Sequence, residues 1–77
     1  MSDTACVGKD YTFKITPQNM GDVAITVGTE AVSPKSEVED PPGTWTITID
    51  GSDIVLPGPV KAVEGSTILH EATVENC

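Results

Sequence analysis

The side chains able to carry acid–base or nucleophilic chemistry are few and lie far apart in the sequence. The only histidine is His70, which alternates with Ile68, Ala72 and Val74. On a β-strand this alternation directs the imidazole toward the core or toward a contact with another chain. Acyl transfer needs a nucleophile, a base and an orienting group within reach of one another. The sequence offers no such set, so we expect a protein that is not an enzyme and has no catalytic residues.

The acidic residues and glycines do not follow the spacing of a metal or cofactor site. Residues 50–53 read Asp-Gly-Ser-Asp, but a calcium loop needs further oxygen ligands at fixed offsets and a bidentate glutamate at its end. The glycines stand singly at expected turns and do not form a phosphate-binding loop. Two cysteines and one histidine do not make a zinc motif. We therefore expect neither a metal nor a cofactor.

The two cysteines, Cys6 and Cys77, lie near the two ends of the sequence. In a reducing cytoplasm both remain free thiols, which is our first interpretation. The alternative is a disulfide that joins the first strand to the last. In a chain-entropy treatment, closing a loop of this length stabilises the fold by about 4 kcal/mol.

The charge of the chain restricts its partners. Twelve acidic residues stand against four lysines, there is no arginine, and the net charge is −8. Binding to nucleic acid or to an anionic membrane depends on clustered Lys and Arg, so we expect neither as a direct partner. The expected partner is a protein or a second copy of the chain. The N-terminal residues are neither basic nor strongly apolar, so we expect no signal peptide and a cytoplasmic or virion-associated location.

The composition favours strands over helices. Val, Ile and Thr together make 25 of the 77 residues, whereas Leu occurs twice. β-Branched side chains suit a pleated surface and lose rotamer freedom in a helix. The sequence therefore predicts a single all-β domain over residues 1–77, either a small antiparallel sandwich or a five- to six-stranded, partly open barrel.

Period-two alternation divides the chain into two hairpins and a final strand. Tyr11, Phe13 and Trp45 belong to the apolar faces of these strands. We expect residues 50–53 to form a tight hairpin turn that is followed by a returning strand over 54–56. The expected segments are an N-terminal arm (1–10), a first hairpin (11–32), a proline-rich acidic loop (33–43), a second hairpin (44–63) and a last strand (67–75).

Unprotected strand edges are expected to pair with other chains. Pro57 and Pro59 protect one edge, because proline has no backbone N–H to offer a neighbouring strand. Nothing comparable protects the strand over residues 23–27. We therefore predict oligomerisation or partner binding at that edge.

Two groups of residues are candidates for partner binding. Thr44, Thr46 and Thr48 line the polar side of one strand, and Thr12, Thr16 and Thr26 extend this hydroxyl surface if their strands are neighbours. Such a surface is either a solvated sheet face or a contact with another subunit. The acidic loop contributes Glu37, Glu39 and Asp40, which are either solvated charges in a flexible segment or a recognition segment for a basic partner.

These features favour a small, non-enzymatic structural or interaction protein that docks onto a larger assembly and forms a homo-oligomer. A short, threonine-rich, arginine-free β protein is typical of the accessory proteins of bacteriophages and prophages, such as capsid-decorating or tail-associated proteins. The alternative is an acidic inhibitor that mimics nucleic acid and occupies the basic groove of a host protein. The acids lie mainly in turns rather than in ordered rows, which favours the first hypothesis.

Overall fold

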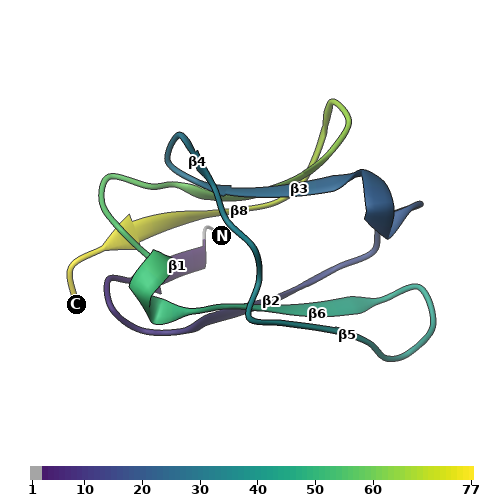
Figure 1. Cartoon of the computed structure of the whole chain (residues 1–77), viewed down its shortest axis with the longest axis horizontal. Helices are drawn as coiled ribbons and strands as arrows, with labels where there is room; N and C mark the ends of the chain where they lie inside the picture. Colours follow the sequence, from purple (N-terminus) through teal and green to yellow (C-terminus); the bar gives the residue numbers. More distant parts are fainter. Residues whose placement is uncertain (1–2) are drawn as a thin grey trace.

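The computed structural model, which describes residues 3–77, has eight strands, and β-branched and aromatic residues alternate along the longer ones (Figure 1). Two single-turn 3-10 helices, η1 (Met20–Asp22) and η2 (Gly51–Asp53), complete the regular structure. The strands are β1 (Asp3–Cys6), β2 (Tyr11–Ile15), β3 (Val23–Val27), β4 (Glu30–Ala31), β5 (Ser36–Glu39), β6 (Trp45–Ile49), β7 (Val60–Glu64) and β8 (Thr67–Glu75).

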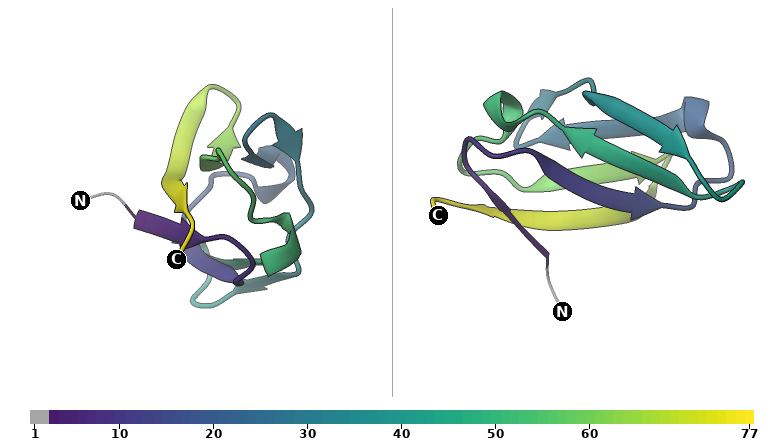
Figure 2. Two further views of the ribbon diagram at one scale, coloured as in Figure 1. Left: turned by 90° about the vertical axis from the view of Figure 1, so that its left-hand side faces the viewer. Right: turned by 90° about the horizontal axis from the view of Figure 1, so that it is seen from below.

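The strands form two sheets that face each other across one core. The order is β1-β8-β7-β3-β4 in the five-stranded sheet and β2-β6-β5 in the three-stranded sheet. An end-on view shows the two layers (Figure 2, left). The prediction of an all-β fold is confirmed, and the strands form two facing sheets rather than a closed barrel.

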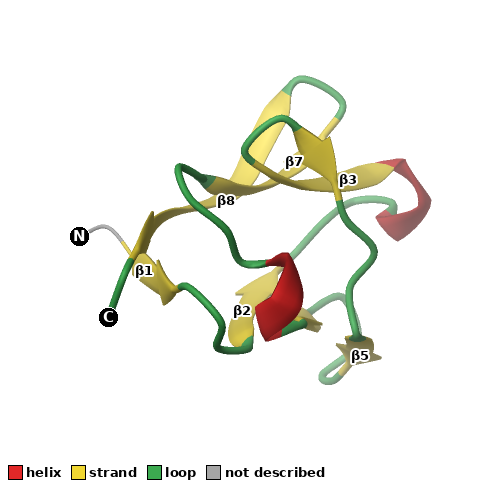
Figure 3. Cartoon of the chain, turned by 60° about the vertical axis from the view of Figure 1, so that its left-hand side comes forward, coloured by secondary structure: helices red, strands yellow, loops and turns green. Residues whose placement is uncertain are grey.

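The two predicted hairpins are wrong because their strands lie in different sheets. β2 pairs with β6, whereas β3 pairs with β7. Consequently, β2 and β3 do not pair with each other, and neither do β6 and β7. Figure 3 shows η1 and η2 (red) on the connections that cross between the sheets. Alternation locates a buried face, but strands that face each other across a core have the same alternation as strands that pair.

Three further expectations about the strands are also wrong. The N-terminal arm contains β1, which pairs with β8 in parallel, so the fold is not purely antiparallel. The loop over 33–43 contains β5, which pairs with β6. The strand for which an open edge is expected, β3, lies between β7 and β4, and β4 covers it at Thr26 and Val27.

The chain crosses between the two sheets four times. The connections β1–β2, β2–β3, β4–β5 and β6–β7 each join strands of different sheets, as in sandwiches with Greek-key connections.

The core is made mainly of isoleucine and valine from both sheets. Phe13 and Ile15 are buried as expected, whereas Tyr11 and Trp45 are partly buried. The predicted strand over 54–56 is wrong, because the segment leaves η2 as a loop and only its first residue, Ile54, enters the core. The largest fully buried side chains are Ile47, Ile49, Ile54, Val27 and Val60.

A disulfide joins Cys6 to Cys77, with 5.4 Å between the Cα atoms. The interpretation as free thiols is therefore wrong, and the alternative is confirmed. Parallel pairing explains the bond, because Cys6 lies opposite Glu75, two residues before Cys77. The bond fastens the short edge strand β1 to the end of β8.

Loss of this disulfide is expected to destabilise the fold strongly. The bond closes a loop with a sequence separation of 71 residues, for which the chain-entropy treatment gives about 4 kcal/mol. Urea unfolding followed by the fluorescence of Trp45, the only tryptophan, measures the free energy of unfolding. The free energy of unfolding should fall by the same amount in three variants: Cys6→Ser, Cys77→Ser and the double variant. Reductant should not change the free energy of unfolding of any of them. Equal stability of the wild type with and without reductant would contradict this expectation.

Gly51 is required where η2 packs against the loop before β2. A Cβ atom at this position would lie 2.6 Å from the backbone oxygen of Gly8. The Gly51 N–H donates to Asp10 Oδ1 (2.8 Å), and Lys35 Nζ donates to Asp10 Oδ2 (2.6 Å). These two hydrogen bonds hold the pKa of Asp10 below its usual value.

Gly51→Ala should therefore lower the free energy of unfolding by about 2 kcal/mol, because backbone must move to admit the methyl group. Gly21→Ala is the matched control, since its Cβ would meet only the side-chain oxygen of Asn19, at 3.3 Å. Both values come from urea unfolding. Similar losses in the two variants would show that the close approach at Gly51 does not limit stability.

Candidate functional site

The outer side of the three-stranded sheet carries short hydroxyl side chains that lie side by side. Cross-strand register aligns Thr12, Thr48 and Ser36 in one row. The next row contains Lys14, Thr46 and Val38. We call these six residues the hydroxyl face; the view from below shows β5, β6 and β2 side by side (Figure 2, right). A hydrogen bond of 3.1 Å joins the hydroxyl groups of Thr12 and Thr48.

The hydroxyl face is distinguished by its charge. None of the six residues that define it is acidic, although the net charge is −8. The nearest carboxylates along these strands, Asp10 and Asp50, adjoin the face at the start of β2 and the end of β6. Lys14 is its only charged residue. Val38, which lies on the edge strand β5, is 52% exposed. The face presents hydroxyl groups, methyl groups and one ammonium group, which suits contact with an uncharged protein surface.

The predicted hydroxyl surface is only partly correct. Thr46 and Thr48 belong to it, as does Thr12. Thr44 lies directly before β6, where its backbone oxygen accepts the Asp40 N–H (2.9 Å), so it adjoins the face without being one of its paired residues. Thr26 lies on β3 in the other sheet, and Thr16 follows the end of β2.

Sequence reasoning missed Ser36 and Val38 because the prolines and acidic residues of 33–43 indicate a loop rather than a strand. They alternate with glutamates in Ser-Glu-Val-Glu, which is a period-two signal. An edge strand with no apolar side lacks the usual hydrophobic alternation, so its polar alternation is easily overlooked.

The predicted acidic recognition segment is not a flexible loop. Glu37 and Glu39 lie on β5, opposite Ile47 and Trp45 on β6, yet both are exposed because β5 is at the edge of its sheet. The Glu39 carboxylate accepts the Gly43 N–H (2.9 Å) and so supports the turn that contains Asp40. Charges on the inward side of an edge strand oppose the addition of another strand. These glutamates therefore protect the β5 edge.

The only histidine joins the two sheets. The His70 ring on β8 stacks on Phe13 of β2, with a centroid distance of 4.5 Å and an interplanar angle of 4°. A hydrogen bond of 2.7 Å joins His70 Nε2 to the Tyr11 hydroxyl, and Asp3 Oδ2 lies 3.5 Å from the same nitrogen. The inward direction predicted for His70 is confirmed. Its side chain is 14% exposed, and this geometry serves packing between the sheets.

A β-bulge explains why Ile68 does not follow His70 inward. The β7–β8 register changes between Val63, opposite Ile68, and Ala62, opposite His70, so Leu69 is an extra residue on β8. The alternation predicted for Ile68 and His70 is therefore interrupted. Ile68 is consequently 54% exposed.

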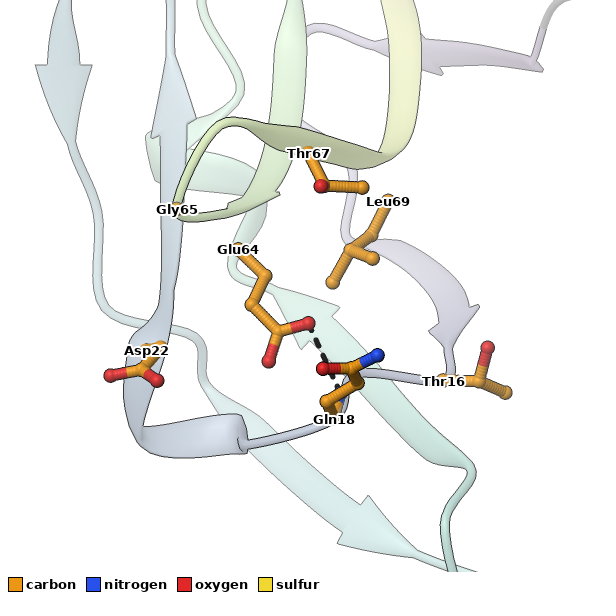
Figure 4. Close-up of a pocket in the computed structure, with 7 residues that line it drawn as sticks. All are labelled: Thr16, Gln18, Asp22, Glu64, Gly65, Thr67 and Leu69. Atoms are coloured by element: carbon orange, nitrogen blue, oxygen red, sulfur yellow. Dashed lines mark hydrogen bonds between the residues drawn. The ribbon is translucent and has the colours of Figure 1, made fainter.

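A surface hollow of about 530 Å³ lies at the end of the three-stranded sheet where β2 finishes (Figure 4). The Glu64 carboxylate accepts the Gln18 N–H (3.0 Å) and the Asn19 N–H (2.6 Å). Its role is thus to hold the loop before η1. The Asp22 carboxylate points away from that of Glu64 in Figure 4. The lining residues are Thr16, Gln18, Asp22, Glu64, Gly65, Thr67 and Leu69.

Within residues 3–77, no three side chains of the His, Cys, Asp or Glu type come close enough together to hold a metal ion. No helix in this described part of the chain is long and apolar enough to cross a membrane.

Comparison with known proteins does not place the chain in a family. No family model matches it, and neither a curated protein nor a solved structure is found to be similar. The function must therefore be argued from the chain's own residues.

Tyr11 gives a direct test of the contact between the sheets. Burial, with a smaller contribution from the negative charge of Asp3, raises the pKa of Tyr11 from 10.0 to about 12. The folded state thus favours the neutral phenol. Its contribution to stability is complete below pH 10 and is lost as the pH rises toward 12.

Because Tyr11 is the only tyrosine, the ultraviolet absorbance of phenolate reports on it alone. We expect a midpoint near pH 12 in the native protein and near 10 in urea. In Tyr11→Phe, stability should fall less between these pH values than in the wild type. A native midpoint at the urea value would show that the phenol is not buried against His70.

Proposed function

We propose that this chain is a small, non-enzymatic interaction protein that docks onto a larger protein assembly through the hydroxyl face. The observation that carries the proposal is the absence of carboxylates from this face, in a chain whose net charge is −8. Elsewhere, acidic residues lie on edge strands, on the internal strands β7 and β8 and in turns, for example Glu37 on β5, Glu71 on β8 and Asp53 in η2.

Desolvation is the physical reason why this distribution favours docking. Burying an unpaired carboxylate in an interface costs several kcal/mol, and the centres of protein interfaces are depleted of charged residues. Threonine and serine lose little side-chain entropy on contact compared with Lys or Glu. A sheet face made of these residues can be covered by another protein at low cost, and its hydroxyl groups adapt as donors or acceptors.

The face also indicates the chemistry of the partner. A flat protein surface that carries one carboxylate opposite Lys14 and is otherwise uncharged fits both the hydroxyl rows and the single ammonium group. The composition favours a virion as the assembly, with the chain as a decoration or tail-associated protein. The Cys6–Cys77 disulfide supports an oxidising surrounding such as the outside of a particle.

An acidic inhibitor that mimics nucleic acid receives less support. Several carboxylates already have partners within the chain, which leaves fewer for a basic groove. Those that accept hydrogen bonds are Asp10, Glu39, Asp50 and Glu64, and Glu71 forms an ion pair with Lys61 at 3.5 Å.

The test uses a photo-crosslinking amino acid at position 46, at the centre of the hydroxyl face, and at position 73 on the outer side of β8 as the matched control. Exposed to a lysate of its native cells, the chain should crosslink to one protein from position 46 and not from position 73. Thr46→Glu should weaken binding of that protein at least about tenfold, which corresponds to 1.4 kcal/mol, and Thr73→Glu should leave it unchanged.

Salt separates the two hypotheses. Docking through the hydroxyl face should change little with ionic strength, whereas an acidic mimic should lose its partner steeply as salt rises. Equal effects of the two glutamate substitutions, or a steep salt dependence, would remove the docking proposal.

A further inference from the structure

The four edge strands of the two sheets differ in charge. Three of them carry carboxylates: Asp3 on β1, Glu30 on β4, and Glu37 with Glu39 on β5. The fourth, β2, reads Tyr-Thr-Phe-Lys-Ile. It has no acidic residue, and its only charge is the ammonium group of Lys14.

The backbone of β2 has groups available for a further strand. Among the described residues, the backbone hydrogen bonds of residues 11–15 go to β6 alone. In an antiparallel edge strand, alternate N–H and C=O groups point away from the sheet and can template another strand. β1 does not occupy this position, because it pairs with β8 in the other sheet.

We propose that β2 pairs antiparallel with β2 of a second copy of this chain, which joins two three-stranded sheets into one continuous sheet. This inference does not depend on the docking function, because the pair forms from this chain alone.

Pairing centred on Phe13 keeps the two sides of the sheet in register. Thr12 then lies opposite Lys14 of the partner subunit on the outer side, and Tyr11 lies opposite Ile15 of the partner subunit on the core side. Lys14 then has two diagonal neighbours in the partner subunit, Asp10 and the other Lys14, at about 7–8 Å between such positions. No carboxylate meets a carboxylate, which favours this edge over the other three.

The asymmetry of the three-stranded sheet limits the assembly to two copies. Its other edge, β5, is short and presents Glu37 and Glu39, which oppose strand addition. With one edge open and one blocked, self-pairing gives a closed two-fold dimer rather than a filament. The two hydroxyl faces then become one surface, so any partner of this face is bound with avidity.

Light scattering during size exclusion, over a wide range of protein concentration, tests the proposal. The wild type should reach twice the 8.0 kDa of one chain. Lys14→Glu should raise the dissociation constant of the dimer at least about tenfold, because it places a carboxylate at the paired edge. Thr46→Glu lies on the same face but on the central strand β6, so it should dimerise like the wild type.

Hydrogen exchange of the backbone amides identifies the contact even if Lys14→Glu is poorly folded. The outward amides of β2 should exchange more slowly as the wild-type concentration rises, whereas those of β5 should not change. A mass of one chain at every concentration overturns the proposal. Equal dissociation by Thr46→Glu, or concentration-dependent protection of β5 in place of β2, also overturns it. Loss of docking by Thr46→Glu with an intact dimer separates this inference from the docking proposal.

Discussion

The burial of β-branched side chains between two small sheets is the interaction on which the rest of the structure depends. Ile47 and Ile49 of β6 have no exposed surface, and neither has Val60 of β7 on the facing sheet. Each such side chain contributes about 1.5–3 kcal/mol when it leaves water. A 77-residue chain buries a smaller fraction of its surface than a larger domain does. The disulfide therefore supplements the core by fastening β1, an edge strand whose only buried residue is Ala5.

Alternation in the sequence was sufficient to find the faces of most strands but not their neighbours. Phe13, Ile15, Ile25 and Val27 are all buried, as the period of two predicted. Yet β2 and β3 lie in different sheets, although the same pattern would equally suit a hairpin. The choice depends on the long crossing connections that contain η1 and η2, whose lengths exclude a tight turn. The parallel position of β1 was equally hidden, because it pairs with residues almost seventy positions away.

The sequence predicted only part of the hydroxyl face, because alternation gives the outward side of a strand but not its neighbours. Thr46 and Thr48 alternate with buried isoleucines, so their outward direction followed from the sequence. Ser36 and Val38 did not, because the glutamates between them gave β5 the composition of a loop. The structure brings the threonines and the acidic segment onto neighbouring strands. Their side chains nevertheless project to opposite sides of the sheet, which separates a face without carboxylates from an edge that carries them.

This separation has a physical consequence for how so acidic a protein can associate. A charge of −8 on a small body opposes contact between any two copies, and it does so most where carboxylates would be brought together. Association is then favoured only where the local charge departs from the average, which here means β2 and the outer side of its sheet. The acidic residues on β1, β4 and β5 disfavour contacts at those three edges. The edge that is left for association is β2. A single Lys14 among hydroxyl groups is sufficient to distinguish that strand, because the discrimination arises from the repulsion at the other edges rather than from strong attraction at this one.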